Sequence, residues 1–455
     1  MAYTNFIAAI DLGTSRMVGV VGTKNAAGAL SIIACDTEGS GDAIHRGCVY
    51  NIEETARRIR RLISKLENKL EGARIGKVYV GIDGQSLRSI EHNVSKLLGS
   101  EGVVTEEVLS SLRNECRKYH SDETVDVLAQ ESPIYFLDDK PVSNPLGLSG
   151  TRIEARYQLI VGRPSLRRNV AQSFERAKVG VAGYAIAPLA LADILLSARD
   201  KEQGCALIDL GAGTTSLAVY KHGNLINLSV VPLGGDLITK DIESLGLSAQ
   251  EAERVKLTYG SAISDKADAD MSLSSTGSRG TRISLRDLNN VIEAREREIL
   301  ENVCACLARI RMVGSLGAGV TITGGAANLK RLPEMVRDIF KMEVCYPSIR
   351  RELMADEEMA VNDSFYAVAL GILNTGTENC AIPPKEEPKP EPKPEPEPES
   401  KPVVTPDTEP KPEPVPDPKP VEKKKKPREK KSGGLFGGLK EGLNRFTGTL
   451  FNENE

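Results

Sequence analysis

One short hairpin pattern occurs twice in this chain, about 200 residues apart. The first copy, FIAAIDLGTSRMVGVVG at 6–22, reads as an apolar strand, a tight Asp-Leu-Gly turn and a second apolar strand. The second copy, CALIDLGAGTTSLAVY at 205–220, has the same order of strand, turn and strand. Two hairpins with the same turn predict two homologous halves that face one shared site.

The residue types in the two turns suit a bound phosphate. Glycine permits a positive φ and lets a phosphate approach the backbone N–H groups, and nearby hydroxyls add donors. Asp11 and Asp209 end their strands, where they are placed to hold the water ligands of a Mg²⁺ ion that bridges the phosphates. One such turn alone would more often be an ordinary hairpin, so the repetition favours a site. The candidate phosphate-binding residues are Gly13, Thr14, Ser15, Gly211, Gly213, Thr214 and Thr215.

A third element, VTITGGAANLKRLPEMVRDIF at 320–340, reads as a β-branched strand, a turn of small residues and an amphipathic helix. Gly324, Gly325 and Ala326 in that turn would let a nucleoside lie against the backbone, although a plain strand-to-helix turn would look the same. The chain has no GxxxxGK[ST] sequence, which argues against a P-loop NTPase. Strand periodicity follows the GAGTT segment, which argues against a Rossmann turn.

Composition excludes several other classes. Lys and Arg total 59 against 63 Asp and Glu, a net charge of -4, which argues against a general nucleic-acid binder. The eight cysteines form no CxxC pair, so neither a zinc ribbon nor a disulfide scaffold is expected. The sequence has no apolar run of membrane-spanning length and no secretory signal, so a cytosolic chain is expected. The four histidines cluster nowhere near the two turns, so no catalytic group can be assigned and no dedicated enzyme is expected.

The composition changes abruptly towards the C-terminus. Of the 25 prolines, 17 lie between Pro383 and Pro427, among Glu and Lys residues. Such a segment cannot form a core, so residues 377–431 are predicted to be an extended, disordered linker. A polyproline docking track is an alternative role, but a spacer is favoured.

Residues 432–455 follow the basic run KKKKPREKK and carry apolar residues at helical spacing. A glycine-rich amphipathic segment behind a basic run is typical of an interfacial membrane anchor, although docking onto a partner or the chain itself remains an alternative. The free energy gained by burying the apolar side chains of this tail nearly cancels the entropy cost of ordering it. One tail is therefore expected to bind a membrane weakly, whereas several tails on one oligomer are expected to bind it firmly. The predicted membrane-facing residues are Leu435, Phe436, Leu439, Leu443, Phe446 and Leu450, with Lys440 and Arg445 at the headgroups.

With its paired Asp-Leu-Gly turns and its TGGAA turn, the chain resembles members of the actin and heat-shock-chaperone ATPase superfamily. The chain is more closely similar to the FtsA family of actin-like bacterial cell-division proteins. That similarity lies in NPLGLSG at 144–150, AERVKLTYG at 252–260 and VIEARERE at 291–298, and in an anchor helix after a variable linker. It covers residues 5–375 almost continuously. The long Pro-rich linker and the Gly-rich terminal segment depart from the family pattern.

The resemblance implies an α/β, actin-like ATPase fold of two ribonuclease H-like halves, each with an inserted subdomain. A helix is expected to begin near Glu106 in the first insertion, and another is expected from Leu285 to Arg297 in the second. The implied boundaries are 1–85 and 164–200 for the first half, 86–163 for its insertion, 201–234 and 309–376 for the second half, and 235–308 for its insertion.

The resemblance also implies ligands. Glu253 and Lys256, one helical turn apart, correspond to the pair that grips ribose and adenine of ATP in the family, although alone they would read as a surface ion pair. The second insertion would bind the C-terminal peptide of FtsZ, the tubulin-like ring protein. Its candidate contacts are Arg286, Glu293 and Arg295, for each of which a solvated helix face is the simpler interpretation.

The implied function is an ATP- and Mg²⁺-binding protein that polymerises and tethers FtsZ filaments of the Z ring to the cytoplasmic membrane. It would lie peripherally on the inner face of that membrane at the division site and recruit later division proteins. Two alternatives remain open. A sugar-type kinase of the same superfamily would need a carboxylate base in the cleft, and an actin-like shape or pilus protein would keep the site but change the partner.

Overall fold

The computed structural model describes residues 5–99, 102–119, 124–266, 268, 272–274, 282–347, 349–354 and 365–382. The predicted linker beyond residue 382 lies outside the described residues, as does the predicted anchor segment 432–455 with its membrane-facing residues. The elements below all belong to one unit, residues 1–387.

The first half is built on a five-stranded sheet in the order β12-β6-β1-β2-β3. Strands β1, β2 and β3 are antiparallel neighbours, whereas β6 and β12 run parallel to β1. Almost every residue of β1 is buried, because helices cover both faces of this sheet. The strands are β1 (Ile7–Leu12), β2 (Arg16–Lys24), β3 (Leu30–Gly39), β6 (Lys77–Ile82) and β12 (Gly180–Ile186).

The second half repeats this order as β15-β14-β13-β18-β19. Here too three antiparallel strands are followed by two parallel ones, with β18 beside β13. The predicted internal repeat, and with it the actin-like two-half fold, is confirmed. The strands are β13 (Cys205–Leu210), β14 (Thr215–Lys221), β15 (Asn224–Val231), β18 (Val320–Thr323) and β19 (Val344–Cys345).

Helices α1 (Ile52–Glu67) and α3 (Ser165–Ala177) pack together beside the first sheet. The side chain of Asn51 caps α1 by accepting a hydrogen bond from the backbone N–H of Glu54. In the second half, α6 (Gly235–Glu243), α7 (Ala249–Tyr259) and α8 (Leu285–Arg309) pack on one another, and α9 (Leu332–Phe340) packs on α8. Helix α8 extends well beyond the predicted end at Arg297.

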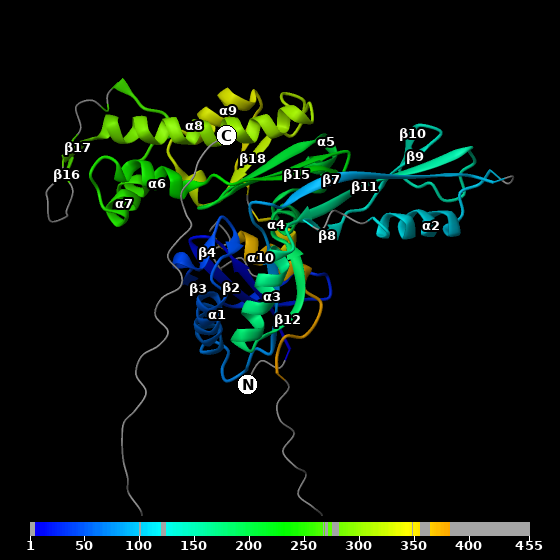
Figure 1. Cartoon of the computed structure of the whole chain (residues 1–455), viewed down its shortest axis with the longest axis horizontal. Helices are drawn as coiled ribbons and strands as arrows, with labels where there is room; N and C mark the ends of the chain where they lie inside the picture. Colours follow the sequence, from blue (N-terminus) through cyan, green and yellow to red (C-terminus); the bar gives the residue numbers. More distant parts are fainter. Residues whose placement is uncertain are drawn as a thin grey trace, which may run out of the picture. The chain divides into compact units, whose positions relative to one another are not determined.

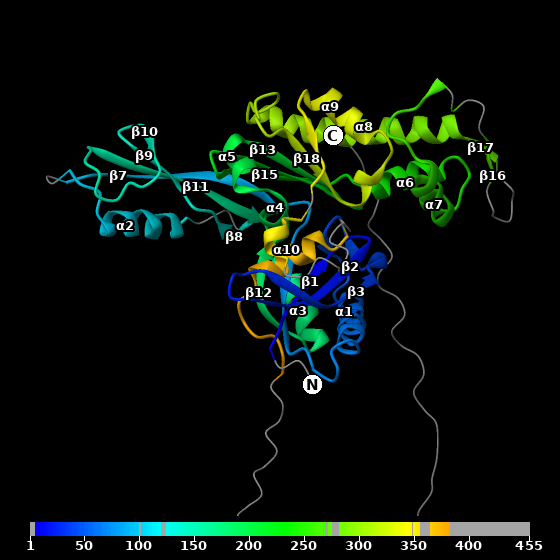
Figure 2. The ribbon, with the colours of Figure 1, turned by 180° about the vertical axis from the view of Figure 1, so that it is seen from behind.

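An inserted subdomain lies between β6 and α3 and has its own apolar core. Its predicted helix begins at Glu106, where the side chain of Thr105 caps it. Strand β7 pairs with β15 through Arg88 and Ser229, so the sheet of the insertion continues the sheet of the second half (Figures 1 and 2). The elements are β7 (Arg88–Leu97), α2 (Glu106–Arg117), β8 (Asp126–Gln130), β9 (Ile134–Leu137), β10 (Lys140–Val142) and β11 (Arg152–Gly162).

The last described helix, α10 (Ala367–Thr375), belongs to the first half and not, as predicted, to the second. It packs against α4 (Ala187–Leu195) and β1. Gly371 makes this packing close, because a Cβ atom there would lie 2.4 Å from the carbonyl oxygen of Ala190. Helix α10 is apolar on every side, so its sequence does not indicate which half it covers. The predicted second-half range 309–376 was therefore wrong to include α10.

Residues 377–382 also pack on the first half, so the predicted start of the linker at 377 was six residues too early. The backbone N–H of Cys380 donates to Phe6 O at 2.8 Å, and Gly76 N–H donates to Cys380 O at 2.9 Å. The hydroxyl of Tyr79 accepts hydrogen bonds from the backbone N–H groups of residues 377 and 378. Composition alone changes only at Pro383, which hides this short attachment.

The remaining short elements connect these layers. They are η1 (Gly41–Ala43), β4 (Ile44–His45), β5 (Cys48–Val49), α5 (Ala198–Gln203), β16 (Ser272–Ser274), β17 (Arg282–Ser284), η3 (Gly325–Asn328) and η4 (Arg351–Leu353). In the described part of the chain, no helix is long and apolar enough to cross a membrane.

Candidate functional site

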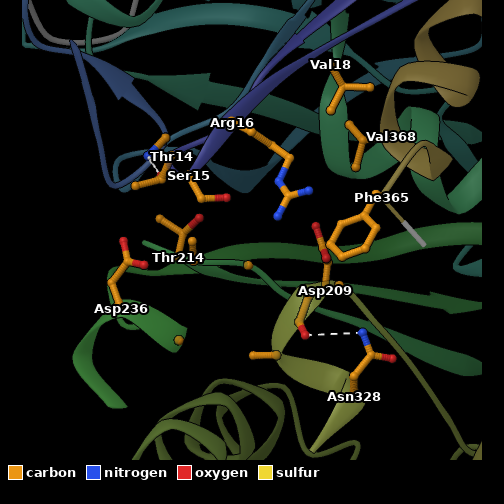
Figure 3. A pocket seen from close by; sticks show the side chains of 18 of the residues that line it. Thr14, Ser15, Arg16, Val18, Asp209, Thr214, Asp236, Asn328, Phe365 and Val368 are labelled. Carbon is orange, nitrogen blue, oxygen red and sulfur yellow. Dashed lines mark hydrogen bonds between the residues drawn. The ribbon is translucent and has the colours of Figure 1, made fainter. Parts of the chain in front are cut away.

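A cavity of about 560 Å³ lies between the two repeated hairpin turns. The first-half turn, residues 11–16, forms one wall, and the second-half turn with the start of α6 forms the facing wall (Figure 3). Residues of α7 and of the segment from β18 into η3 complete the lining. This volume falls within the range of pockets that bind nucleotide-sized ligands. All residues that the sequence assigns to phosphate, metal or nucleoside contacts line the cavity, except Gly213 and Thr215.

The two turns have matching backbone geometry. A Cβ atom on Gly13 would lie 2.6 Å from Arg16 O, and one on Gly211 would lie 2.8 Å from Thr214 O. Each turn therefore folds back so tightly that its Asp-Leu-Gly glycine has no room for a side chain. Thr14 Oγ1 accepts a hydrogen bond from the backbone N–H of Gly47 at 2.9 Å, which fixes its side chain at the cavity wall.

Gly213 and Thr215 have structural roles that the sequence did not reveal. A Cβ atom on Gly213 would lie 2.7 Å from Thr14 Oγ1, so this glycine lets the two turns touch. Thr215 is fully buried at the start of β14, and its hydroxyl donates to Leu233 O at 2.9 Å. The prediction that Thr215 offers a free hydroxyl donor to a ligand was therefore wrong.

Three carboxylates meet at one end of the cavity: Asp11, Asp209 and Asp83. Burial raises the pKa of Asp11 to about 7, and the charges of Asp83 and Asp209 contribute to the shift. Burial, followed by the charge of Asp83, raises the pKa of Asp209 to about 7 as well. The pKa of Asp83 is also raised by burial. Mutual repulsion and desolvation of this kind would be relieved by a cation.

Asp83 was not predicted as a site residue from the sequence, although the sequence contains a signal for it. Asp83 follows β6 directly, and β6 runs parallel to β1, which Asp11 helps to end. Because parallel strands meet at the same sheet edge, their terminal carboxylates converge there. Asp83 Oδ1 is buried and has no hydrogen-bond partner within the described structure.

The turn after β18 brings the backbone to the edge of the carboxylate cluster. Gly324 has φ of 95°, and a Cβ atom there would lie 2.5 Å from both Asp209 Oδ1 and Leu210 O. The chain then enters η3, where Asn328 Nδ2 donates to Gly325 O at 3.3 Å (Figure 3). The predicted order of strand, small-residue turn and helix is present, with η3 preceding α9.

Lys256 on α7 is buried beside the start of α6, with only 7% of its surface exposed. Its ammonium group donates to Gly235 O at 3.0 Å and to Thr239 Oγ1 at 2.8 Å, and it lies 2.7 Å from Glu253 Oε2. The half-exposed carboxylate of Glu253 thus lines the cavity with its charge partner held in place. This is more than the surface ion pair that spacing alone would suggest.

Glu296 lies on α8 beneath this network and is fully buried. Neither carboxylate oxygen has a hydrogen-bond partner among the described residues. Burial raises the pKa of Glu296 to about 8, and the positive charge of Lys256 only partly offsets this effect. Glu296 is therefore held mainly as the neutral acid at pH 7.

The three predicted partner contacts on α8 differ in their surroundings. Arg295 binds Asp241 with two nitrogens, at 2.5 and 3.2 Å, and also pairs with Glu298. Glu293 accepts a hydrogen bond from the backbone N–H of Ser264 at 2.8 Å. Both side chains are thus engaged within the chain, and of the three only Arg286 is exposed.

Several lining residues were not singled out from the sequence: Arg16, Asp236, Asn328, Lys330 and Phe365, besides Asp83. Arg16 and Phe365 lie against each other, with the guanidinium carbon 4.3 Å from the ring centroid. No group of three or more His, Cys, Asp and Glu side chains within the described ranges is arranged to ligate a metal directly.

Comparison with known proteins matches the chain to two family models. The model described as "Cell division protein FtsA" matches residues 206–371, and the model described as "SHS2 domain inserted in FTSA" matches residues 84–161. The "Cell division protein FtsA" of Porphyromonas gingivalis is 32% identical over 380 residues, covering 82% of this chain and 78% of the relative. That of Bacillus subtilis is 30% identical over 383 residues, covering 82% and 84%.

Among solved structures, a chain of the "PilM-PilN type IV pilus biogenesis complex" superposes with a TM-score of 0.58 at 17% identity. The match covers 81% of this chain and 97% of that one. At this level of identity the match supports the shared fold and nothing more specific.

Proposed function

The chain belongs to the FtsA family of cell division proteins, and on this basis we propose that it is an ATP-binding, actin-like adaptor. It assembles into filaments on the inner face of the cytoplasmic membrane at the division site and tethers FtsZ filaments there. The observation that carries this proposal is the cavity between the two Asp-Leu-Gly turns, which is lined by residues of both halves. A ligand that contacts both halves would select one angle between them, and with it the state that polymerises.

The cavity suits a nucleoside triphosphate. Backbone N–H groups of the two glycine turns, with the hydroxyls of Thr14, Ser15 and Thr214, would hold the phosphates. Glu253 presents a carboxylate towards the cavity with Lys256 beside it, an arrangement that suits the hydroxyls of a ribose. The small residues Gly324, Gly325 and Ala326 line the cavity and would leave room for the nucleoside.

The carboxylate cluster fits a magnesium ion bound through water. Asp83 Oδ1 is buried without a hydrogen-bond partner among the described residues, and burial raises the pKa values of Asp11 and Asp209 to about 7, so a cation here would stabilise the ionised acids. Magnesium would neutralise charge on the phosphates. Asp11 and Asp209 would accept hydrogen bonds from its water ligands, and Asp83 would add a third acceptor.

Removal of Mg²⁺ with EDTA is expected to weaken ATP binding by about 10- to 100-fold, measured by isothermal titration calorimetry. The variant Asp209→Asn should lose most of this Mg²⁺ effect. In EDTA, however, Asp209→Asn should bind ATP at least as well as wild type, because it removes a carboxylate that repels the phosphates. Weaker binding by Asp209→Asn in both conditions would contradict the proposed role.

The tail outside the described residues supplies the proposed membrane contact. Residues 432–455 would lie on anionic lipid, and the Pro-rich linker would let the tails of several subunits reach the surface together. FtsZ would bind through its C-terminal peptide on the second insertion, and later division proteins would be recruited. Since Glu293 and Arg295 are engaged internally, Arg286 is the contact to test for the FtsZ peptide.

An Arg286→Glu variant is expected to bind a synthetic FtsZ C-terminal peptide about 3- to 10-fold more weakly by fluorescence anisotropy. Arg309→Glu, an exposed residue at the far end of the same helix, is the matched control and should bind normally. Equal affinities for the two variants would place the peptide elsewhere.

A further inference from the structure

Arg16 follows the first phosphate turn directly and brings the only guanidinium among the described residues that line the cavity. Its side chain points from the first-half turn into the cavity, towards Asp209 and Phe365 (Figure 3). The guanidinium rests on the ring of Phe365, at 4.3 Å from its centroid. Arg16 is therefore held in a defined place at the phosphate end of the site.

The two lysines of the lining, unlike Arg16, already bind groups of the protein. Lys256 donates to Gly235 O and Thr239 Oγ1 and pairs with Glu253. Lys330 donates to Thr258 O at 3.4 Å. By contrast, Arg16 has no ion pair with any described residue, and its ordered contact is the aromatic ring. Its charge is thus available to an anion that enters the cavity.

The geometry assigns that charge to the outermost phosphate. Phosphates next to the turns would meet backbone N–H groups and the short hydroxyls of Thr14, Ser15 and Thr214. The longer side chain of Arg16 extends beyond those donors, to the side where Phe365 and Asp209 lie. We propose that Arg16 contacts the terminal phosphate of a bound nucleoside triphosphate and so lets the site distinguish a triphosphate from a diphosphate. This inference rests on the proposed nucleotide binding.

When no terminal phosphate is present, the guanidinium of Arg16 would stay in contact with the ring of Phe365. A cation–π contact at a partly exposed site is weaker than a bidentate, charge-assisted hydrogen bond from guanidinium to phosphate. A triphosphate would therefore draw Arg16 off the ring, whereas a diphosphate would leave it there. Phe365 precedes α10 by two residues and lies 3.9 Å from the position of a Cβ on Gly325, so it would report the change to both halves.

The test compares ATP and ADP affinities, each with Mg²⁺, by isothermal titration calorimetry on the full chain. Arg16→Ala is expected to weaken ATP binding by about 10- to 100-fold and ADP binding by less than about threefold. Arg16→Lys keeps the charge but loses the bidentate geometry, so it should recover part of the ATP preference. Phe365→Leu should keep the preference for ATP. Arg168→Ala, an exposed arginine on α3 of the same half, is the matched control.

The outcomes separate this inference from the proposed function. If wild type binds neither nucleotide, nucleotide binding itself is refuted. If wild type binds both and Arg16→Ala weakens them equally, or changes neither, Arg16 does not read the terminal phosphate. Thermal unfolding of each variant is measured to detect a general loss of folding. The melting temperatures are expected to stay close to that of wild type. Should Arg16→Ala unfold, the ATP-to-ADP ratio of Arg16→Lys decides the question, and an unchanged ratio would overturn the inference.

Discussion

Replacing Glu296 with glutamine is expected to raise the free energy of unfolding by about 2–4 kcal/mol at pH 8 and to change it little at pH 5. The Glu296 carboxyl is fully buried without a hydrogen-bond partner among the described residues, and its pKa is raised from 4.5 to about 8. Between these two values the folded chain keeps a proton that the unfolded chain has released. Stability therefore falls as pH rises from about 4.5 to about 8, and the glutamine variant lacks this penalty.

Urea unfolding at pH 5 and pH 8 measures the effect. Asp11 and Asp209 also have raised pKa values, so wild type and variant share a residual fall in stability with pH. The difference between the two proteins isolates Glu296. Glu301→Gln, an exposed substitution on the same helix, is the control and should change stability by less than about 0.5 kcal/mol at both pH values. If Glu296→Gln changes the free energy of unfolding by the same amount at pH 5 and pH 8, the raised pKa of Glu296 is not the cause of the change.

Replacing Gly324 with alanine is expected to lower the free energy of unfolding by about 3 kcal/mol. The φ angle of 95° is costly for any residue with a side chain, and the new Cβ would lie 2.5 Å from Asp209 Oδ1 and Leu210 O. Relief of this clash requires movement of the carboxylate that is proposed to hold the water ligands of magnesium. ATP binding should therefore weaken by at least about tenfold as well.

The neighbouring Gly325 provides a matched control for stability. A Cβ atom on Gly325 would meet no heavy atom closer than Phe365 Cε1, at 3.9 Å. Thermal and urea unfolding should therefore place Gly325→Ala within about 0.5 kcal/mol of wild type. If the two alanine variants are equally stable, the close approach of this turn to Asp209 does not hold.

Features that depend on local spacing could be predicted from the sequence. The two Asp-Leu-Gly turns, the strand and turn at 320–326 and the helix start at Glu106 each depend on a few neighbouring residues. Repetition of the hairpin then predicted the matching halves, because similar sequences form similar sheets. The cavity contains most of the residues that were named on these grounds.

Features that depend on which surfaces meet could not be predicted in this way. Helix α10 is apolar all round, so nothing local tells that it covers the first sheet. Gly213 looks like a ligand contact but instead lets the two turns touch, a role set by Thr14 some 200 residues away. Asp83 required knowledge that β6 lies beside β1, and Arg16 required the position of Phe365. Long-range contacts of this kind are settled by packing and not by sequence periodicity.

The central claim is that ATP-dependent assembly holds this chain on a membrane through its tail. Co-sedimentation with anionic liposomes tests it directly, with and without ATP and Mg²⁺, for the full chain and for a chain that ends at Ser432. We expect the full chain to pellet with liposomes when ATP and Mg²⁺ are present and much less without them, and we expect truncation to abolish the binding. Equal pelleting of the full and truncated chains would contradict it, since the tail would then not be the anchor.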